Sequence, residues 1–179
     1  MDLETRIDQF TAALENLAGS VIRVSTRDEA RAVVANRIGA ATAVASGASF
    51  LKECGITGLP GVRSDFSDAA EYREACARAD FGITSADYAL ADTGSLVMFS
   101  GHEESRLVSL LPPAHIAVVP LSRLLTGLDE LLTRVPAPAE QSSAMIFITG
   151  PSRTADIEQI LVRGVHGPGQ VTVILVSPV

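Results

Sequence analysis

The hydrophobic pattern of the chain alternates between helix-like and strand-like segments. Apolar residues recur every three or four positions over residues 5–18, which predicts an amphipathic helix. Short, nearly continuous apolar runs over residues 21–24 and 42–46 predict buried strands. Between these runs, Ser25 or Thr26 can cap a helix that extends through Ile38. The chain therefore opens in the order helix, strand, helix, strand.

A hairpin is predicted in the middle of the chain. Residues 88–91 and 95–99 are strand-like and are separated by Asp92-Thr93-Gly94, which predicts an antiparallel pair with Gly94 at positive φ. The other expected elements are helices over residues 50–53, 67–78, 103–111, 121–134 and 155–162, loops over 59–65 and 136–143, and a glycine-rich turn over 164–169.

Three further runs carry the strongest strand signal. Residues 115–119, 145–149 and 171–176 are almost entirely apolar, which is typical of strands buried on both faces of a parallel sheet. We therefore expect them to be adjacent, mostly parallel strands. Together with the alternating helices, they predict an α/β fold with a three-layer, mostly parallel sheet and an antiparallel hairpin. At 179 residues, the chain is expected to form one domain over residues 1–179.

The loop after residues 145–149 is the first candidate site. Ser152, Arg153 and Thr154 follow Gly150-Pro151, at the carboxyl end of a predicted strand and the start of a predicted helix. Hydroxyls, a guanidinium and free N–H groups at a helix start together suit a carboxylate or a phosphate. The alternative to an anion site is a purely structural loop. In that case the hydroxyl of Ser152 or Thr154 caps the helix, while Arg153 pairs with Asp156 or Glu158 of the same helix.

Two more polar loops are expected to line one cleft together with Ser152, Arg153 and Thr154. Asp92, Thr93 and Ser95 belong to the predicted hairpin, and His166 lies in the glycine-rich turn. The alternative for Asp92 is that it hydrogen-bonds its own turn. His166 and His115 lack any metal-ligand spacing, so no metal site is expected.

Composition excludes several functions. The formal net charge of −7 disfavours binding to nucleic acid. Cys54 and Cys76 are the only cysteines, so the chain alone cannot hold an iron–sulfur cluster with four thiolates. Glycine-rich dinucleotide and P-loop fingerprints are absent. No basic, apolar leader and no apolar run of membrane-spanning length is present, and we expect a cytoplasmic protein that does not insert into membranes.

Three longer motifs point to a family. They are GITSADYALADTGSLV (residues 82–97), SLLPPAHIAVVP (residues 109–120) and ITGPSRTADIEQILVRGVHGP (residues 148–168). In this order and separation they resemble the lactate-utilisation protein C family, the LUD domain. One departure is Asp92, because the family usually carries Glu-Thr-Gly at this turn.

The resemblance implies a fold akin to the ribose-5-phosphate isomerase and CoA-transferase group. It also implies a role in a three-component system that oxidises L-lactate to pyruvate, with iron–sulfur clusters on partner subunits and no cofactor in this chain. Two alternatives remain open: a stand-alone enzyme of the sugar-phosphate isomerase or CoA-transferase type, and a metabolite sensor. The resemblance names no catalytic residue.

Overall fold

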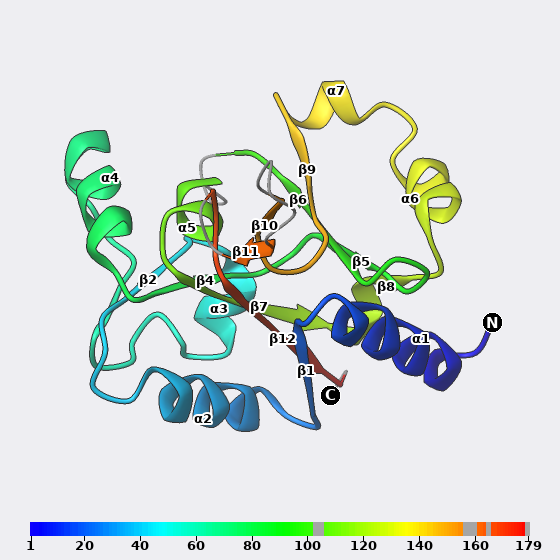
Figure 1. The fold of residues 1–179 in the computed structure, drawn as a ribbon, viewed down its shortest axis with the longest axis horizontal. Coiled ribbons are helices and arrows are strands. Elements are labelled where there is room, and N and C mark those ends of the chain that lie inside the picture. Colours follow the sequence, from blue (N-terminus) through cyan, green and yellow to red (C-terminus); the bar gives the residue numbers. More distant parts are fainter. Residues whose placement is uncertain (102–105, 156–160, 164–165, 178–179) are drawn as a thin grey trace.

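Three β-sheets and their flanking helices make up the described part of the chain (Figure 1). The structure is a computed structural model, and it describes residues 1–101, 106–155, 161–163 and 166–177. The helices are α1 (Leu3–Asn16), α2 (Arg27–Ile38), α3 (Ser49–Glu53), α4 (Ala69–Arg78), α5 (Arg106–Leu110), the 3-10 turn η1 (Leu121–Arg123), α6 (Leu128–Arg134) and α7 (Pro138–Gln141). None of these helices is both long and apolar enough to cross a membrane.

Six parallel strands form the main sheet, in the order β1-β12-β7-β4-β2-β3. These strands are β1 (Ser20–Val24), β2 (Ala43–Ala45), β3 (Val62–Arg63), β4 (Phe81–Thr84), β7 (Ala114–Pro120) and β12 (Gln170–Val176). Helices α2 and α3 pack on one face, while α1, α4, α5 and a second sheet cover the other. The predicted α/β class, with a mostly parallel sheet and helices on both sides, is confirmed.

Both faces of β7 and β12 are buried. Ile116 and Ile174 contact the layer that contains α2 and α3, and Ala117 and Val173 contact the opposite layer. Because neither face meets water, both strands are apolar at nearly every position. The prediction that these two strands are adjacent and parallel is confirmed.

The second sheet contains four strands in the order β8-β5-β6-β9. They are β5 (Tyr88–Leu90), β6 (Ser95–Phe99), β8 (Leu124–Leu125) and β9 (Met145–Ile148). The predicted hairpin of β5 and β6 is confirmed, with Gly94 at φ 66°.

The expectation that residues 145–149 join β7 and β12 is wrong. Strand β9 pairs antiparallel with β6, at the edge of the second sheet. Its side chains are only half-buried, and Phe147 is 42% exposed. An apolar run this short shows that a strand is present, but it does not say which sheet the strand joins.

Two predicted helices are also wrong. Within residues 121–134, Leu124 and Leu125 are extended and pair with β5, so the helix begins only after Gly127. Instead of a helix over residues 155–162, β10 (Arg153–Ala155) pairs antiparallel with β11 (Leu161–Arg163), and residues 156–160 lie outside the described part. In both cases, tertiary pairing overrides helical spacing.

Two main-sheet strands were not predicted. Strand β3 lies within the expected loop over residues 59–65, and its two residues are too few to give a pattern. Strand β4 contains Gly82, which weakens a strand signal. A Cβ on Gly82 would collide with the carbonyl oxygen of Val108, so glycine is needed there for α5 to pack closely on the sheet.

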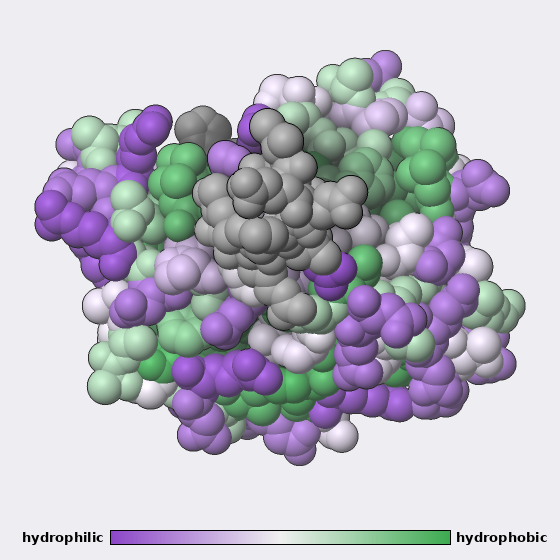
Figure 2. Space-filling model, viewed as in Figure 1, coloured by the Kyte–Doolittle hydropathy of each residue, from purple (hydrophilic) through white to green (hydrophobic). Residues whose placement is uncertain are grey.

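The outer face of the second sheet is incompletely covered. Leu131 and Val135 of α6 pack against Leu90 and Val97 of the sheet. Figure 2 shows apolar surface over α6 and in the hollow beside it. The second sheet therefore keeps apolar groups such as Phe147 in contact with solvent.

Candidate functional site

A pocket of about 270 Å³ lies along β9, and we call it the β9 pocket. Helix α5 forms one wall, β9 and the residues after it form another, and the turn before β12 closes the third side. The lining residues are Arg106, Ser109, Leu110, Ile146, Phe147, Ile148, Thr149, Gly150, Ser152, His166, Gly167 and Pro168.

The β9 pocket lies at the amino ends of β7 and β12. Its turn directly precedes β12, and the N–H of Gly169 in that turn donates to the carbonyl of Pro113, just before β7, at 2.9 Å. The site was expected at the carboxyl ends of the parallel strands. It lies elsewhere because β9 belongs to the second sheet.

Ser152 and His166 are brought together as predicted, since both line the β9 pocket. The N–H of Ser152 donates to the carbonyl of Pro168 at 2.8 Å, which fixes the loop to the turn. Ser95 is buried behind the pocket, and its hydroxyl shares a 2.8 Å hydrogen bond with the hydroxyl of Thr149, which lines the pocket. Ser95 thus positions a lining hydroxyl.

Asp92 and Thr93 lie at another place on the second sheet. The N–H of Asp92 donates to the carbonyl of Thr126 at 3.1 Å, and its carboxylate lies against Gly127, where α6 begins. A carboxylate at this position complements the positive end of the helix. The contacts of Asp92 therefore indicate a structural role.

Arg153 and Thr154 begin β10 rather than a helix. Arg153 is exposed and is not among the residues that line the β9 pocket. Thr154 is paired through the strand with Val162. Asp156 and Glu158, the alternative partners of Arg153, lie outside the described residues. A binding role for Arg153 and Thr154 remains a prediction.

Arg106 and Ser109 were not singled out from the sequence. Both lie on α5, three residues apart, and this spacing places two side chains on the same face of a helix. Arg106 is exposed and forms no ion pair with another described residue. It is therefore the guanidinium available to a ligand in the β9 pocket.

Polar groups that were not predicted from the sequence also gather at the carboxyl end of β4. Arg123 donates to the carbonyl of Ala86 at 2.8 Å and to the hydroxyl of Ser85 at 3.4 Å. The Asp87 carboxylate accepts the N–H of Phe99 at 2.7 Å, and burial raises its pKa. These bonds join the main sheet to the hairpin, so the cluster holds the two sheets together.

His115 is buried between the two sheets. Its Nε2 shares a 2.8 Å hydrogen bond with the Thr84 hydroxyl, and its Nδ1 has no partner among the described residues. Burial lowers the pKa of His115 to about 4. The imidazole is therefore neutral at neutral pH. His166, in contrast, lies at the surface in the β9 pocket.

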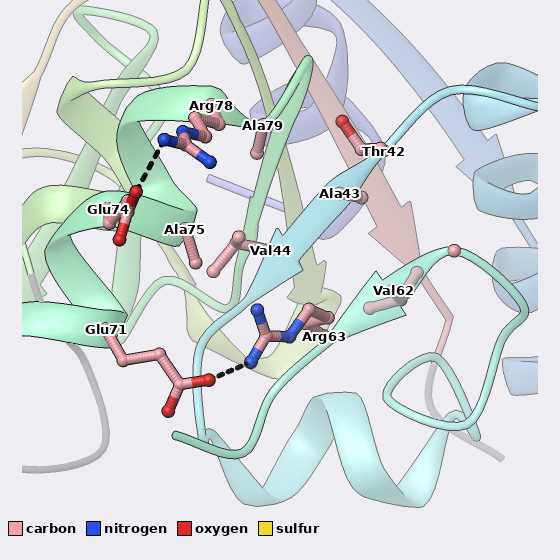
Figure 3. Close-up of a pocket in the computed structure, with 11 residues that line it drawn as sticks. Thr42, Ala43, Val44, Val62, Arg63, Glu71, Glu74, Ala75, Arg78 and Ala79 are labelled. Atoms are coloured by element: carbon pink, nitrogen blue, oxygen red, sulfur yellow. Dashed lines mark hydrogen bonds and ion pairs between the residues drawn. The ribbon is translucent and has the colours of Figure 1, made fainter. Parts of the chain in front are cut away.

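A larger groove of about 570 Å³ runs between α4 and the edge of the main sheet, and we call it the α4 groove. Figure 3 shows its charged side chains in pairs, with Arg63 and Glu71 joined between β3 and α4 and with Glu74 and Arg78 joined along α4. Arg63 lies 2.6 Å from Glu71, and Arg78 lies 2.6 Å from Glu74. Hydrogen bonds from Ser67 and Arg63 lower the pKa of Glu71 to about 2. With each guanidinium already neutralised, this groove suits an anion less well than the β9 pocket.

The two cysteines lie in different cores. Cys54 packs beside α2 and α3, and Cys76 packs between α4 and the opposite face of the main sheet. Burial raises the pKa of both thiols, that of Cys54 to about 11. No group of three or more His, Cys, Asp or Glu side chains in the described ranges is placed to hold a metal ion. This donor set does not fit an iron–sulfur cluster.

Comparison with known proteins identifies the family. The LUD domain model matches residues 7–176. The chain belongs to the LUD domain family. Its fold is similar to that of a DUF162 family protein from Deinococcus radiodurans in a crystal structure, with a TM-score of 0.75, 22% identity and coverage of 98% of this chain and 99% of the other.

Two relatives named lactate utilization protein C are similar in sequence to this LUD domain chain. The protein from Halalkalibacterium halodurans is 40% identical over 117 residues, which cover 63% of this chain and 51% of the relative. The protein from Bacillus subtilis is 39% identical over 124 residues, which cover 67% and 52%. The chain thus spans about half the length of the curated relatives it matches.

Proposed function

We propose that this LUD domain chain is a subunit of a lactate-utilisation system that oxidises L-lactate to pyruvate, and that it binds a small carboxylate or phosphate ligand. The names of its relatives support the pathway. The observation that carries the ligand proposal is the β9 pocket, whose lining combines Arg106 with the hydroxyl-bearing residues Thr149 and Ser152.

The chemistry of the β9 pocket suits a small acid. Arg106 supplies a planar guanidinium for a carboxylate or phosphate. The hydroxyls of Ser152 and Thr149 can donate to the remaining oxygens, whereas the hydroxyl of Ser109 already donates to the carbonyl of Arg106 at 3.1 Å. The volume of about 270 Å³ lies below the range of about 300–1,000 Å³ for drug-sized ligands. A small acid fits within this volume.

Electron transfer requires a partner in this proposal. Two buried thiols in separate cores do not make a cluster site, so we place the iron–sulfur clusters on other subunits. The isolated chain should then carry no iron and should reduce no acceptor dye when lactate is added. A stoichiometric chromophore that copurifies with the isolated chain would contradict this.

Calorimetric titration with lactate, pyruvate and phosphate tests the ligand proposal. Arg106→Gln should weaken binding by about 1.5–3 kcal/mol, because a charge-assisted hydrogen bond is lost. Arg37→Gln is the matched control, since Arg37 is an exposed arginine on α2, across the main sheet. Arg153→Ala tests the assignment made from the sequence. Equal affinity of the parent and Arg106→Gln for every ligand would reject the site.

A further inference from the structure

The outer edge of β9 carries backbone groups that pair with no other described strand. In the described part of the chain, β9 is an edge strand whose only partner is β6. In an antiparallel pair, alternate residues direct their N–H and C=O groups away from the partner strand. Strand β9 therefore presents a row of donors and acceptors that another strand could pair with.

The β9 pocket lies along this free edge. Five consecutive residues, from Ile146 to Gly150, line it. Successive side chains of a strand point to opposite faces of its sheet. Ile146, Phe147 and Ile148 belong to β9, and a pocket lined by three consecutive strand residues meets the strand at its edge, where the unpaired backbone groups lie.

This edge lacks the usual protection against pairing. Natural edge strands carry charged residues or proline that block the addition of another strand. Residues 141–150 contain neither. Phe147 is 42% exposed and Leu110, on the facing wall, is 44% exposed. Both can cover apolar side chains of an incoming strand.

Arg106 places a positive charge at one end of the β9 pocket. Leu110, at the end of α5, lies beside Gly167, and a Cβ on Gly167 would be 3.7 Å from Leu110 Cδ1 and 3.7 Å from Ser152 Oγ. Arg106 begins the same helix one turn earlier and therefore lies toward the opposite end. A cation at the end of a strand-binding slot complements a carboxylate that terminates the bound strand.

We infer that the β9 pocket takes the extended C-terminal segment of a partner protein, which adds a strand to β9 and places its terminal carboxylate on Arg106. The inference rests on the proposed carboxylate site, and it adds that a peptide backbone carries the carboxylate. A peptide and a small acid would then compete for Arg106.

Affinity selection tests this inference on the full chain. A pool of hexapeptides with randomised Thr, Val, Ile, Leu and Phe positions is prepared with free C-terminal carboxylates and, separately, with C-terminal amides. Immobilised protein should retain the free-acid pool, and Arg106→Gln should lose this preference while Arg37→Gln keeps it. Equal retention of the two pools by the parent protein would overturn the inference.

Backbone methylation of the best free-acid peptide tests strand pairing. Two versions carry N-methyl groups on alternate residues, one on the odd set and one on the even set. Only one set can face β9, so one version should bind about tenfold or more weakly and the other about as well as the parent peptide. Similar binding of both versions would overturn the inference.

Titration with pyruvate distinguishes failure of the peptide inference from failure of the proposed function. Pyruvate binding that depends on Arg106, with no retention of the free-acid pool above the amide pool, would reject the peptide and leave the small-ligand site. Displacement of the bound peptide by pyruvate supports both. Absence of binding by peptide and pyruvate alike would reject both.

Discussion

The six-stranded sheet and the four-stranded sheet differ in how they meet water. Strands β7 and β12 are buried on both faces, whereas β9 is half-buried and lies at an edge. Yet the sequences of all three strands are almost uniformly apolar. In the main sheet the strands are apolar because both faces of β7 and β12 pack against the core. In β9, Ile146 and Ile148 pack against the core, whereas Phe147 between them is 42% exposed and lines the β9 pocket.

The largest expected effect comes from the tight packing of the main sheet. Gly82→Ala should destabilise the protein by about 4 kcal/mol or more, because the new methyl group would collide with backbone of α5. Urea unfolding measures the change in the free energy of unfolding. Gly101→Ala is the control, since no atom of the described residues lies within 4 Å of the added Cβ, and it should change stability by less than about 0.5 kcal/mol. Equal midpoints for the two variants would contradict the packing described for β4 and α5.

Truncation of one apolar residue in each sheet sharpens the comparison. Ile174→Ala, in β12, should cost about 2–5 kcal/mol, because Ile174 is fully buried and its loss leaves a cavity. Phe147→Ala, in β9, should cost less than about 1 kcal/mol, despite the larger side chain, because much of the ring already contacts water. Thermal or urea unfolding of both variants checks this order. A greater loss in Phe147→Ala would show that β9 is as well covered as β12.

His115 is buried and hydrogen-bonded to Thr84 of the neighbouring strand β4, and it gives a pH-dependent effect. Burial lowers its pKa in the folded state from 6.5 to about 4, so the unfolded state binds more protons between these values. Stability should therefore fall as pH drops from 6.5 to 4, by about 3 kcal/mol from this residue. Below pH 4 both states are protonated, and above pH 6.5 both are neutral, so the contribution is then constant.

The variant His115→Leu isolates the contribution of this residue. Its stability should change less than that of the parent across the same pH window, because the variant lacks the imidazole. Some pH dependence should remain, because other titrating groups are present in both proteins. Urea midpoints at pH 4.5 and pH 6.5 provide the measurement. Parallel pH profiles for the parent and the variant would contradict a buried, neutral imidazole.

Local patterns predicted the elements better than their partners. The helical spacing of α1 and the turn residues of the β5–β6 hairpin depend on near neighbours, and both were predicted correctly. The sheet that β9 joins depends on contacts with β6, about fifty residues earlier in the chain. Short apolar runs carry no information about such distant pairing, so β9 was assigned to the wrong sheet.

The candidate site, too, could be predicted only in part from the sequence. Ser152 and His166 stood out because polar residues there interrupt apolar segments, and the structure brings them together. Arg106 lies within a segment predicted only as helical, where a charged residue is usual on the solvent face. Its place in the β9 pocket depends on the packing of α5 beside β9. That packing could not be read from the sequence.

The position at which a small acid binds tests whether the β9 pocket is the ligand site of this protein. Titration of ¹⁵N-labelled protein with pyruvate, followed through backbone amide chemical shifts, reports where the ligand binds. We expect shifts concentrated at residues that line the β9 pocket, namely Ile146–Gly150, Ser152, His166 and Gly167, and we expect these shifts to be lost in Arg106→Gln. Shifts confined to Thr42–Val44 and Gly61–Arg63 of the α4 groove, or no shifts at saturating pyruvate, would contradict this expectation.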